Sequence, residues 1–267
     1  MSMAKDYHKD MIKRYRGELW SKFIRAIKQY SLIENGDKIA VALSGGKDSF
    51  LLAKMLSELR RHPLVDFDIV VVAMDPGYDP KDVERIRETA KSLGLNIVVE
   101  KKDIFKVVGK KAPDNPCYLC ARMRRGSLYA LAEKHGCNKL ALGHHFDDVV
   151  ETTLLNMFFS GTFKTMLPKV SSDNFEGIEL IRPLYFIKEQ AVKKITSRNN
   201  IDTMDCGCTV ASGERPSKRQ EIKELLASLK KVHKDVEKCI FRSASNVNLD
   251  YVLAWEKDGE KHRFDDE

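Results

Sequence analysis

The sequence predicts an α/β fold, a doubly wound parallel sheet with an N-terminal helix and a C-terminal helical extension. Runs of β-branched and aliphatic residues alternate with helix-like segments along most of the chain. These runs are apolar at nearly every position, so that neither face of the strand suits contact with water. Strands of this kind belong to parallel sheets that helices cover on both sides.

The predicted elements follow in order. Trp20, Phe23, Ile24 and Ile27 are spaced as one face of a helix, which ends before "ENGD". Strands are then expected at 38–43 and in "FDIVVVAM", "LNIVVE", "KLALG" and "IELIRPLYF". The helices between them are expected at about 48–61, 81–93, 121–135 and 147–159.

Four segments are expected along the chain. They are an N-terminal helical segment at 1–35, the α/β domain at 36–214, a helical cap at 215–255 and a charged tail at 256–267. An apolar stripe predicts the cap: Ile222, Leu225, Leu226 and Leu229. The charged letters "EKDGEKHRFDDE" predict a tail that frays.

Composition narrows the class of protein. The 267 residues are 43% hydrophobic, enough for a sizeable core, and the net charge of +7 favours polyanionic partners such as nucleic acid. The first thirty residues are highly charged, and eighteen apolar residues never run together. We therefore expect neither a signal peptide nor a membrane span, and a cytoplasmic protein.

The stretch "IAVALSGGKDSFLLAKML" runs a buried strand through a glycine turn into a helix. Ser44, Gly45 and Gly46 allow the backbone to approach phosphate oxygens at the positive end of the helix dipole, and Ser49 adds a hydroxyl. The spacing excludes a Walker A loop and a G-x-G-x-x-G dinucleotide loop. The sequence therefore predicts an anion-binding loop, with a tight packing turn as the alternative.

Four of the six cysteines form close pairs, Cys117 with Cys120 and Cys206 with Cys208. In a reducing compartment such pairs bind metal or carry out redox chemistry. The C-x-x-C pair alone is compatible with half of a zinc site or a redox pair. Cys137 and Cys239 are expected to be small buried side chains.

The segment "GHHFDD" follows the fourth predicted strand and places two histidines and two carboxylates at the sheet edge where ligands bind. A helix cap is the alternative role for Asp147 or Asp148, and a structural role is the alternative for one histidine.

Together these motifs resemble a known family. S-G-G-K-D-S resembles the pyrophosphate-loop ATPases, whose fold is adenine nucleotide alpha hydrolase-like. The segments from "CYLCARMRRG" to "GHHFDDVVETTLLNMFFSG", followed by "IRPLYF", are similar to the tRNA 2-thiocytidine synthetase family and to related cluster-dependent tRNA thiolation enzymes. The resemblance covers about residues 20–219.

The resemblance implies an ATP-dependent tRNA sulfurtransferase. A base carbonyl, C2 of a cytidine in the anticodon loop of tRNA, would be adenylated with ATP and Mg2+, and sulfur from a [4Fe-4S] cluster would replace the oxygen to give 2-thiocytidine. An upstream sulfur donor such as a cysteine desulfurase is implied, and a homodimer is compatible with the relatives. No membrane partner is expected.

The resemblance also implies roles for individual residues. Catalytic roles would fall to Asp48, His144, Asp147 and Asp148. Nucleotide binding would involve Ser44, Gly45, Gly46, Lys47, Asp48, Ser49, Met74 and Gly143. The cluster would be held by Cys117, Cys120 and either Cys208 or Cys206, because "CGC" departs from the C-x-x-C of the family.

Several alternatives stay open. Four thiols would suit a structural zinc site. A persulfide at Cys117 or Cys120 is a second route for sulfur. Two other functions are an adenylating ligase or amidotransferase with structural zinc, and a non-catalytic RNA-binding module.

Contacts with RNA are expected from side chains that flank the motifs. The basic candidates for phosphate contacts are Arg122, Arg124, Arg125, Lys164, Lys169 and Arg182. The aromatic candidates for stacking on a flipped-out base are Phe146, Phe163 and Tyr118. Ordinary surface and core roles are the alternatives for these residues.

Overall fold

The computed structural model describes residues 3–111, 116–204 and 218–266 and divides into two compact units. Unit 1 comprises Met1–Asp148 and Leu167–Arg215, and unit 2 comprises Val149–Met166 and Pro216–Glu267.

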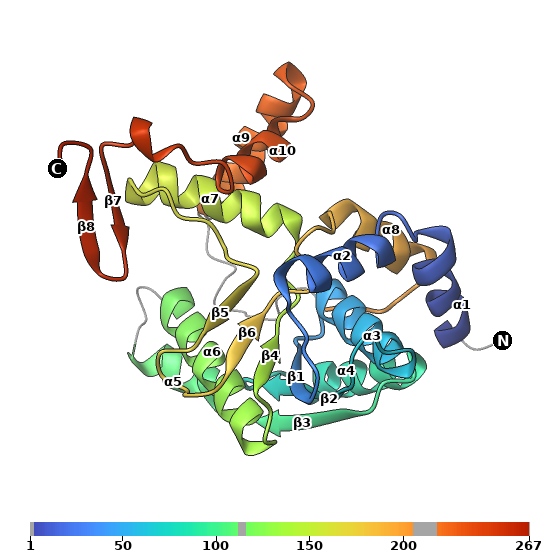
Figure 1. The fold of residues 1–267 in the computed structure, drawn as a ribbon. Coiled ribbons are helices and arrows are strands. Elements are labelled where there is room, and N and C mark those ends of the chain that lie inside the picture. The colour runs from blue at the N-terminus through green and yellow to red at the C-terminus, as the bar shows by residue number, and fades with distance from the viewer. Residues whose placement is uncertain (1–2, 112–115, 205–217, 267) are drawn as a thin grey trace. The chain divides into compact units, whose positions relative to one another are not determined.

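Unit 1 is built on one sheet (Figure 1). Its strands in the described residues are β1 Asp37–Leu43, β2 Phe67–Asp75, β3 Ile97–Lys101, β4 Lys139–Ala141, β5 Lys169–Ser171 and β6 Glu179–Ile181. Their order is β3-β2-β1-β4-β6-β5, and all neighbours are parallel except β5 and β6. The chain steps outward from β1 to β3 and then returns to the other side of β1, so the strand order reverses between β1 and β4. Ligands of open α/β sheets bind at such a reversal.

Helices cover both faces of this sheet. The α-helices of unit 1 are α1 Met3–Lys9, α2 Trp20–Tyr30, α3 Lys47–Arg61, α4 Pro80–Ser92, α5 Ile104–Lys111, α6 Pro116–Lys134 and α8 Glu189–Arg198, with a π-helix at Asp10–Arg14. Figure 1 shows α3 and α4 on one side of the strands and α5 and α6 on the other. On the α6 side, Ala40 and Ala42 of β1 pack with Tyr129 and Ala132 of α6. The predicted doubly wound sheet is confirmed.

Helix α6 differs from its prediction. It begins at Pro116 rather than near residue 121, and therefore includes the C-x-x-C pair, which lies outside the predicted helix. Proline suits the first turn of a helix because its missing N–H needs no partner there. Cys117 and Cys120 are thus one helical turn apart.

Unit 2 contains most of α7 Phe146–Ser160, α9 Lys218–Val232, α10 Val236–Ser243, a short 3-10 helix at Leu249–Tyr251 and the hairpin of β7 Ala254–Lys257 and β8 Glu260–Arg263. Ile222 and Leu226 of the predicted stripe are buried, whereas Leu225 is exposed. The hairpin stands where a frayed tail was expected. Asp258 and Gly259, with φ of 53° and 83°, form its turn, and this dipeptide is a typical hairpin signal.

Among the described residues, no helix has both the length and the apolar character needed to span a bilayer.

Candidate active site

The turn between β1 and α3 forms a closed loop around one hydroxyl. Gly45 has a φ of 85°, and Gly46 is extended just before α3 begins at Lys47. The Ser49 hydroxyl accepts a hydrogen bond from the Ser44 backbone N–H (3.1 Å) and donates to the Gly46 carbonyl (2.8 Å). Ser49 is buried, so its hydroxyl braces the loop from within. The first N–H groups of α3 then lie at the positive end of the helix, where anions bind.

Glycine is required at two positions around this loop. A Cβ on Gly45 would lie 3.0 Å from Ile86 and 3.2 Å from the sulfur of Met204, whose N–H donates to the Gly45 carbonyl (2.9 Å). A Cβ on Gly143 would lie 3.1 Å from the carbonyl carbon of Asp48. Gly143 therefore lets the segment after β4 pack directly on the first turn of α3.

A cavity of about 280 Å³ opens beside the loop. Its lining combines the loop itself, the turn after β2, helix α6 and the segment after α8: Ser44, Gly46, Lys47, Asp48, Tyr78, Arg124, Thr203 and Met204. Arg124 Nη2 donates a hydrogen bond to the Tyr78 hydroxyl at 3.2 Å. The cavity thus joins the predicted nucleotide loop to the helix that carries the first cysteine pair.

Charged groups are paired along the loop. Lys47 Nζ lies 3.0 Å from Asp48 Oδ2 and 3.0 Å from Glu189 Oε1 of α8. Burial opposes the charge of Lys47, but the two carboxylates outweigh it and raise the Lys47 pKa. Burial also opposes ionisation of Glu189, but hydrogen bonds from Lys193 and Lys47 outweigh it and lower the Glu189 pKa to about 2. Lys47 therefore lines the cavity as a charged ammonium group that two carboxylates hold in position.

Asp48 has one oxygen suited to a cation. Its Oδ1 is buried and has no hydrogen-bond partner among the described residues. A buried carboxylate oxygen costs free energy unless something binds it, and Mg2+ with phosphate ligands prefers oxygen donors. The chemistry of this oxygen fits the predicted Mg2+.

His145, which the sequence did not single out, is buried among the predicted carboxylates. Its Nε2 lies 3.8 Å from Asp48 Oδ1, and its Nδ1 lies 3.3 Å from Asp148 Oδ2 and 3.7 Å from Asp147 Oδ2. His145 precedes the first residue of α7 and exchanges hydrogen bonds with Asp148: its N–H donates to Asp148 Oδ2 (2.9 Å), and the Asp148 N–H donates to its Nδ1 (3.4 Å). This is the pattern of a capping box.

Asp147 connects two helices. Its Oδ2 accepts a hydrogen bond from the N–H of Glu189, the first residue of α8, at 2.7 Å. The cap that the sequence offered as an alternative therefore exists for both carboxylates, although Asp147 caps α8 rather than α7. The H-x-x-D spacing of a capping box was the available signal for His145.

The other predicted catalytic and nucleotide-binding residues are not part of the cavity lining. Met74 is buried in a core cluster with Val72 and Cys120, and His144 is half-buried on the segment before α7. Of the residues predicted to bind the nucleotide, the ones that line the cavity are Ser44, Gly46, Lys47 and Asp48.

The predicted thiols are described only in part. Cys120 is buried on α6, and Arg124, four residues later and hence on the same helix face, lines the cavity. The Cys117 side chain and both Cys206 and Cys208 lie outside what the structure describes, but Met204, two residues before Cys206, also lines the cavity. Within the described part of the chain, no three His, Cys, Asp or Glu side chains are arranged to hold a metal ion.

The two other cysteines differ from each other. Cys137 is buried, as expected. Cys239 is exposed, with its sulfur 3.4 Å from His233 Nε2, so the expectation of a buried side chain is wrong there. Helix α10 turns this position toward solvent.

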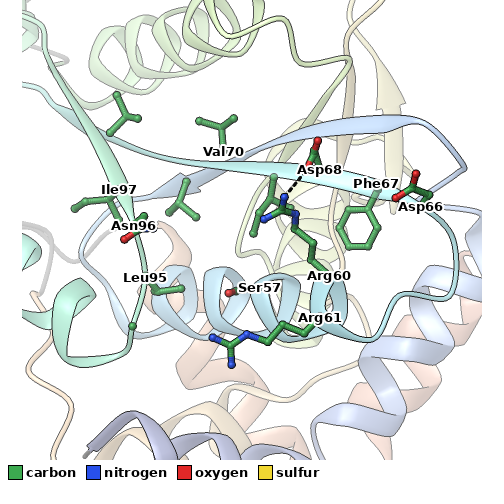
Figure 2. Close-up of a pocket in the computed structure, with 14 residues that line it drawn as sticks. Ser57, Arg60, Arg61, Asp66, Phe67, Asp68, Val70, Leu95, Asn96 and Ile97 are labelled. Carbon is green, nitrogen blue, oxygen red and sulfur yellow. Dashed lines mark ion pairs between the residues drawn. The ribbon is translucent and has the colours of Figure 1, made fainter.

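Cavity size alone does not identify the site. A cavity of about 640 Å³ lies at the amino ends of β2 and β3, whereas the nucleotide loop follows the carboxyl end of β1. Figure 2 shows residues that line this cavity. The cavity exists because β3 pairs with β2 only from Val71 onward. Arg60 and Asp68 form an ion pair within it (2.6 Å).

The chain is similar to known proteins along most of its length. Residues 19–226 match the model of the PP-loop domain family. A tRNA-cytidine(32) 2-sulfurtransferase of Geotalea daltonii is 42% identical over 232 residues, which are 86% of this chain and 91% of the relative. One from Geobacter metallireducens is 40% identical over 243 residues, covering 90% and 93%.

A solved structure shares the fold. The U34-tRNA thiolase NcsA from Methanococcus maripaludis, solved with its [4Fe-4S] cluster, superposes with a TM-score of 0.68 at 22% identity. The match covers 84% of this chain and 76% of that one.

The fold and the glycine loop thus define a PP-loop protein. Within that class, the chain belongs to the tRNA-cytidine(32) 2-sulfurtransferase family. The predicted family is confirmed, and with it the prediction of an enzyme of the tRNA sulfurtransferase class. The roles of individual residues, the domain boundaries, Mg2+, the compartment, the sulfur donor and the homodimer stay predictions.

Proposed function

We propose that this enzyme converts cytidine at position 32 of tRNA to 2-thiocytidine in an ATP-dependent reaction. The observation that carries the proposal is the lining of the cavity beside the loop. Lys47 and Asp48 come from the nucleotide loop, Arg124 comes from the helix of Cys117 and Cys120, and Met204 precedes Cys206. One cavity therefore extends from the proposed phosphate site to the helix of the first cysteine pair and to Met204, two positions before Cys206 in the sequence.

The loop would hold ATP by its phosphates. The N–H groups at the start of α3 provide fixed donors to the departing pyrophosphate, and Asp48 Oδ1 would hold Mg2+. Lys47 would exchange one carboxylate partner for a phosphate oxygen. Such preorganised donors stabilise the charge that develops as the α–β phosphate bond breaks.

Adenylation makes the base oxygen a leaving group. The C2 oxygen of cytidine attacks the α-phosphorus, a new P–O bond forms, and pyrophosphate leaves with the electrons of the broken bond. Arg124 lies at this cavity as a permanent cation that would offset the charge of the transferred group. In the second step a C–S bond forms at C2, and AMP leaves with the former base oxygen.

The cysteines would hold the sulfur source. Cys117, Cys120 and one of Cys206 and Cys208 supply thiolates, the donors that iron–sulfur clusters require, and Cys120 is shielded from solvent. When bound, a [4Fe-4S] cluster with one iron free of cysteine provides a place for sulfide. The structural relative NcsA was solved with a [4Fe-4S] cluster.

Product analysis tests the proposal. Anaerobically reconstituted protein, ATP, Mg2+, sulfide and unmodified tRNA should yield 2-thiocytidine in nucleoside mass spectrometry. Asp48→Ala should abolish pyrophosphate release, because it removes the proposed Mg2+ ligand. Cys120→Ala should abolish thiolation and lower iron content, whereas Cys239→Ala, which changes an exposed thiol elsewhere, should retain both.

Two results would contradict the proposal. Colourless protein with one zinc that forms AMP but no thiolated nucleoside would favour the ligase alternative. Absence of pyrophosphate release with ATP and tRNA, in protein with its full iron content, would favour a non-catalytic RNA-binding protein.

A further inference from the structure

Unit 2 exposes an unusual run of apolar side chains. Residues 157–164, "MFFSGTFK", are all exposed at the end of α7 and just beyond it. Met157, Phe158, Phe159 and Phe163 are 43%, 56%, 42% and 48% exposed. Single exposed apolar residues are ordinary, but four large ones within seven consecutive residues indicate a binding surface.

Hydrogen bonds fix the backbone that presents these side chains. Gly161, with a φ of 61°, ends α7, and the Thr162 N–H donates to the Asn156 carbonyl at 3.1 Å. Asn156 Nδ2 donates to the Lys164 carbonyl at 2.8 Å. The hydroxyls of Thr153 and Thr165 lie 2.9 Å apart. The backbone that carries the aromatic side chains is therefore held in place before any partner binds, which lowers the entropy cost of binding.

Cations accompany the aromatic side chains. Lys218 Nζ lies 4.8 Å from the centre of the Phe159 ring, and Lys164 follows Phe163 in the chain. Within unit 2, residues 149–166 and 216–243 together contain nine Lys or Arg and five Asp or Glu, a net charge of +4. Aromatic faces interleaved with cations suit unstacked bases and phosphates.

We propose that the group formed by Met157, Phe158, Phe159, Phe163, Lys164 and Lys218, here called the aromatic platform, binds a single-stranded segment of the tRNA substrate. The bases would stack on the phenyl rings, and the two lysines would contact the phosphates. The inference rests on the proposed function, because it takes tRNA as the polyanion. A two-fold contact with a second copy is less suitable, since an interface that uses one patch twice brings the same lysines together.

Affinity for tRNA tests the platform. Phe158→Ala and Phe163→Ala should each weaken binding of unmodified tRNA by about ten-fold, because stacking on one aromatic side chain contributes roughly 1–3 kcal/mol per base. The matched control is Tyr251→Ala, which removes an 89% exposed aromatic ring from unit 2 outside the platform and should leave affinity unchanged. Lys164→Gln should reduce the dependence of affinity on salt concentration.

A spectroscopic measurement separates stacking from indirect effects. An anticodon stem-loop with 2-aminopurine in its single-stranded loop should lose fluorescence when it binds the wild-type protein and lose less with Phe158→Ala or Phe163→Ala. Circular dichroism should show that both variants fold, since both side chains are exposed.

Three outcomes would overturn the inference. In the first, wild-type protein thiolates tRNA while the Phe variants bind it as tightly as Tyr251→Ala does, so that the proposed function survives alone. In the second, the Phe variants change the molar mass by light scattering but not tRNA affinity, which would make the patch an interface between copies. In the third, wild-type protein fails to bind tRNA, which overturns the proposed function as well.

Discussion

Lys47 is the residue on which the electrostatics of the loop converge. Its ammonium group contacts Asp48 from its own helix and Glu189 from α8, each at 3.0 Å. Glu189 also accepts a hydrogen bond from Lys193, and its backbone N–H donates to Asp147. One residue, Glu189, thus links the start of α3, the start of α8 and the first turn of α7. A phosphate that approaches Lys47 would replace part of this arrangement rather than meet a free cation.

The Glu189 pair predicts a pH-dependent contribution to stability. The folded-state pKa of about 2 lies below the ordinary value of 4.5, so the carboxylate stabilises the fold above pH 4.5 and loses that effect as the pH falls toward 2. Glu189→Gln should lower the free energy of unfolding at pH 7 by on the order of 1–3 kcal/mol, because each unit of pKa shift corresponds to about 1.4 kcal/mol. Urea unfolding of both proteins between pH 3 and pH 7 measures the difference.

The control for Glu189→Gln is a variant of a carboxylate whose ion pair is exposed to solvent. Glu18→Gln removes another carboxylate paired with an α8 lysine, Lys194, but that pair is about half exposed and should contribute little. If the difference between wild type and Glu189→Gln were the same at pH 3 and pH 7, the assigned ion pairs would be wrong.

The residues of the loop could be predicted from the sequence, but the contacts that each residue makes could not. Ser44, Gly46, Lys47 and Asp48 line the cavity as a strand-to-helix turn predicts. The Ser49 hydroxyl also braces the loop, because it donates to the Gly46 carbonyl and accepts from the Ser44 N–H. Its role in nucleotide binding stays a prediction. Glu189 was missed, since its contacts with Lys47 and Asp147, more than forty positions away, leave no local pattern. His145 was missed although its H-x-x-D spacing with Asp148 gave a local signal. The roles assigned to His144, Asp147 and Asp148 stay predictions.

At the scale of elements, the site depends on how closely the segment after β4 approaches α3. Gly143 makes this approach possible, because a side chain there would meet the backbone of Asp48 and Ser49 at 3.1–3.2 Å. Backbone atoms in a helix cannot move aside as a flexible side chain can. The spacing between the two elements therefore controls the position of Asp48.

Gly143→Ala should disturb both stability and nucleotide binding. We expect a loss of about 1–3 kcal/mol in the free energy of unfolding, as for other overpacked sites, with weaker ATP binding because the first turn of α3 must shift. Calorimetry measures both effects. Gly126→Ala is the control, because a Cβ there meets nothing within 4 Å in helix α6 and should leave stability unchanged or slightly higher. Wild-type melting and ATP affinity in Gly143→Ala would show that the approach is unimportant.

Most sheet elements follow from the sequence, and the exceptions have physical causes. Strands β1 to β4 and helices α3, α4 and α7 lie close to their predicted positions. Long apolar runs mark β1 and β2, and the Asp79 cap with Pro80 marks the start of α4. The short α5 and α8 were missed, and β6 occupies only Glu179–Ile181 of the longer run expected there. Tertiary packing, rather than the local sequence, determines whether such short elements form and where they end. The D-G turn of the final hairpin was a usable signal that high charge obscured.

Over the whole molecule, positive and negative residues are unevenly distributed along the sequence. The last 24 residues, 244–267, contain three Lys or Arg and seven Asp or Glu, so the positive excess belongs to the rest of the chain. Binding of tRNA should therefore weaken steeply with salt. The central claim is that the nucleotide loop and the cysteines bind their ligands at the same cavity.

A crystal structure of the anaerobically reconstituted protein with a non-hydrolysable ATP analogue tests this claim most directly. Anomalous scattering would locate the iron. The account predicts phosphates on the Ser44–Ser49 loop and iron bound to Cys117, Cys120 and one of Cys206 and Cys208, beside the cavity that Arg124 lines. Iron bound far from this loop, or zinc held by all four cysteines, would contradict it.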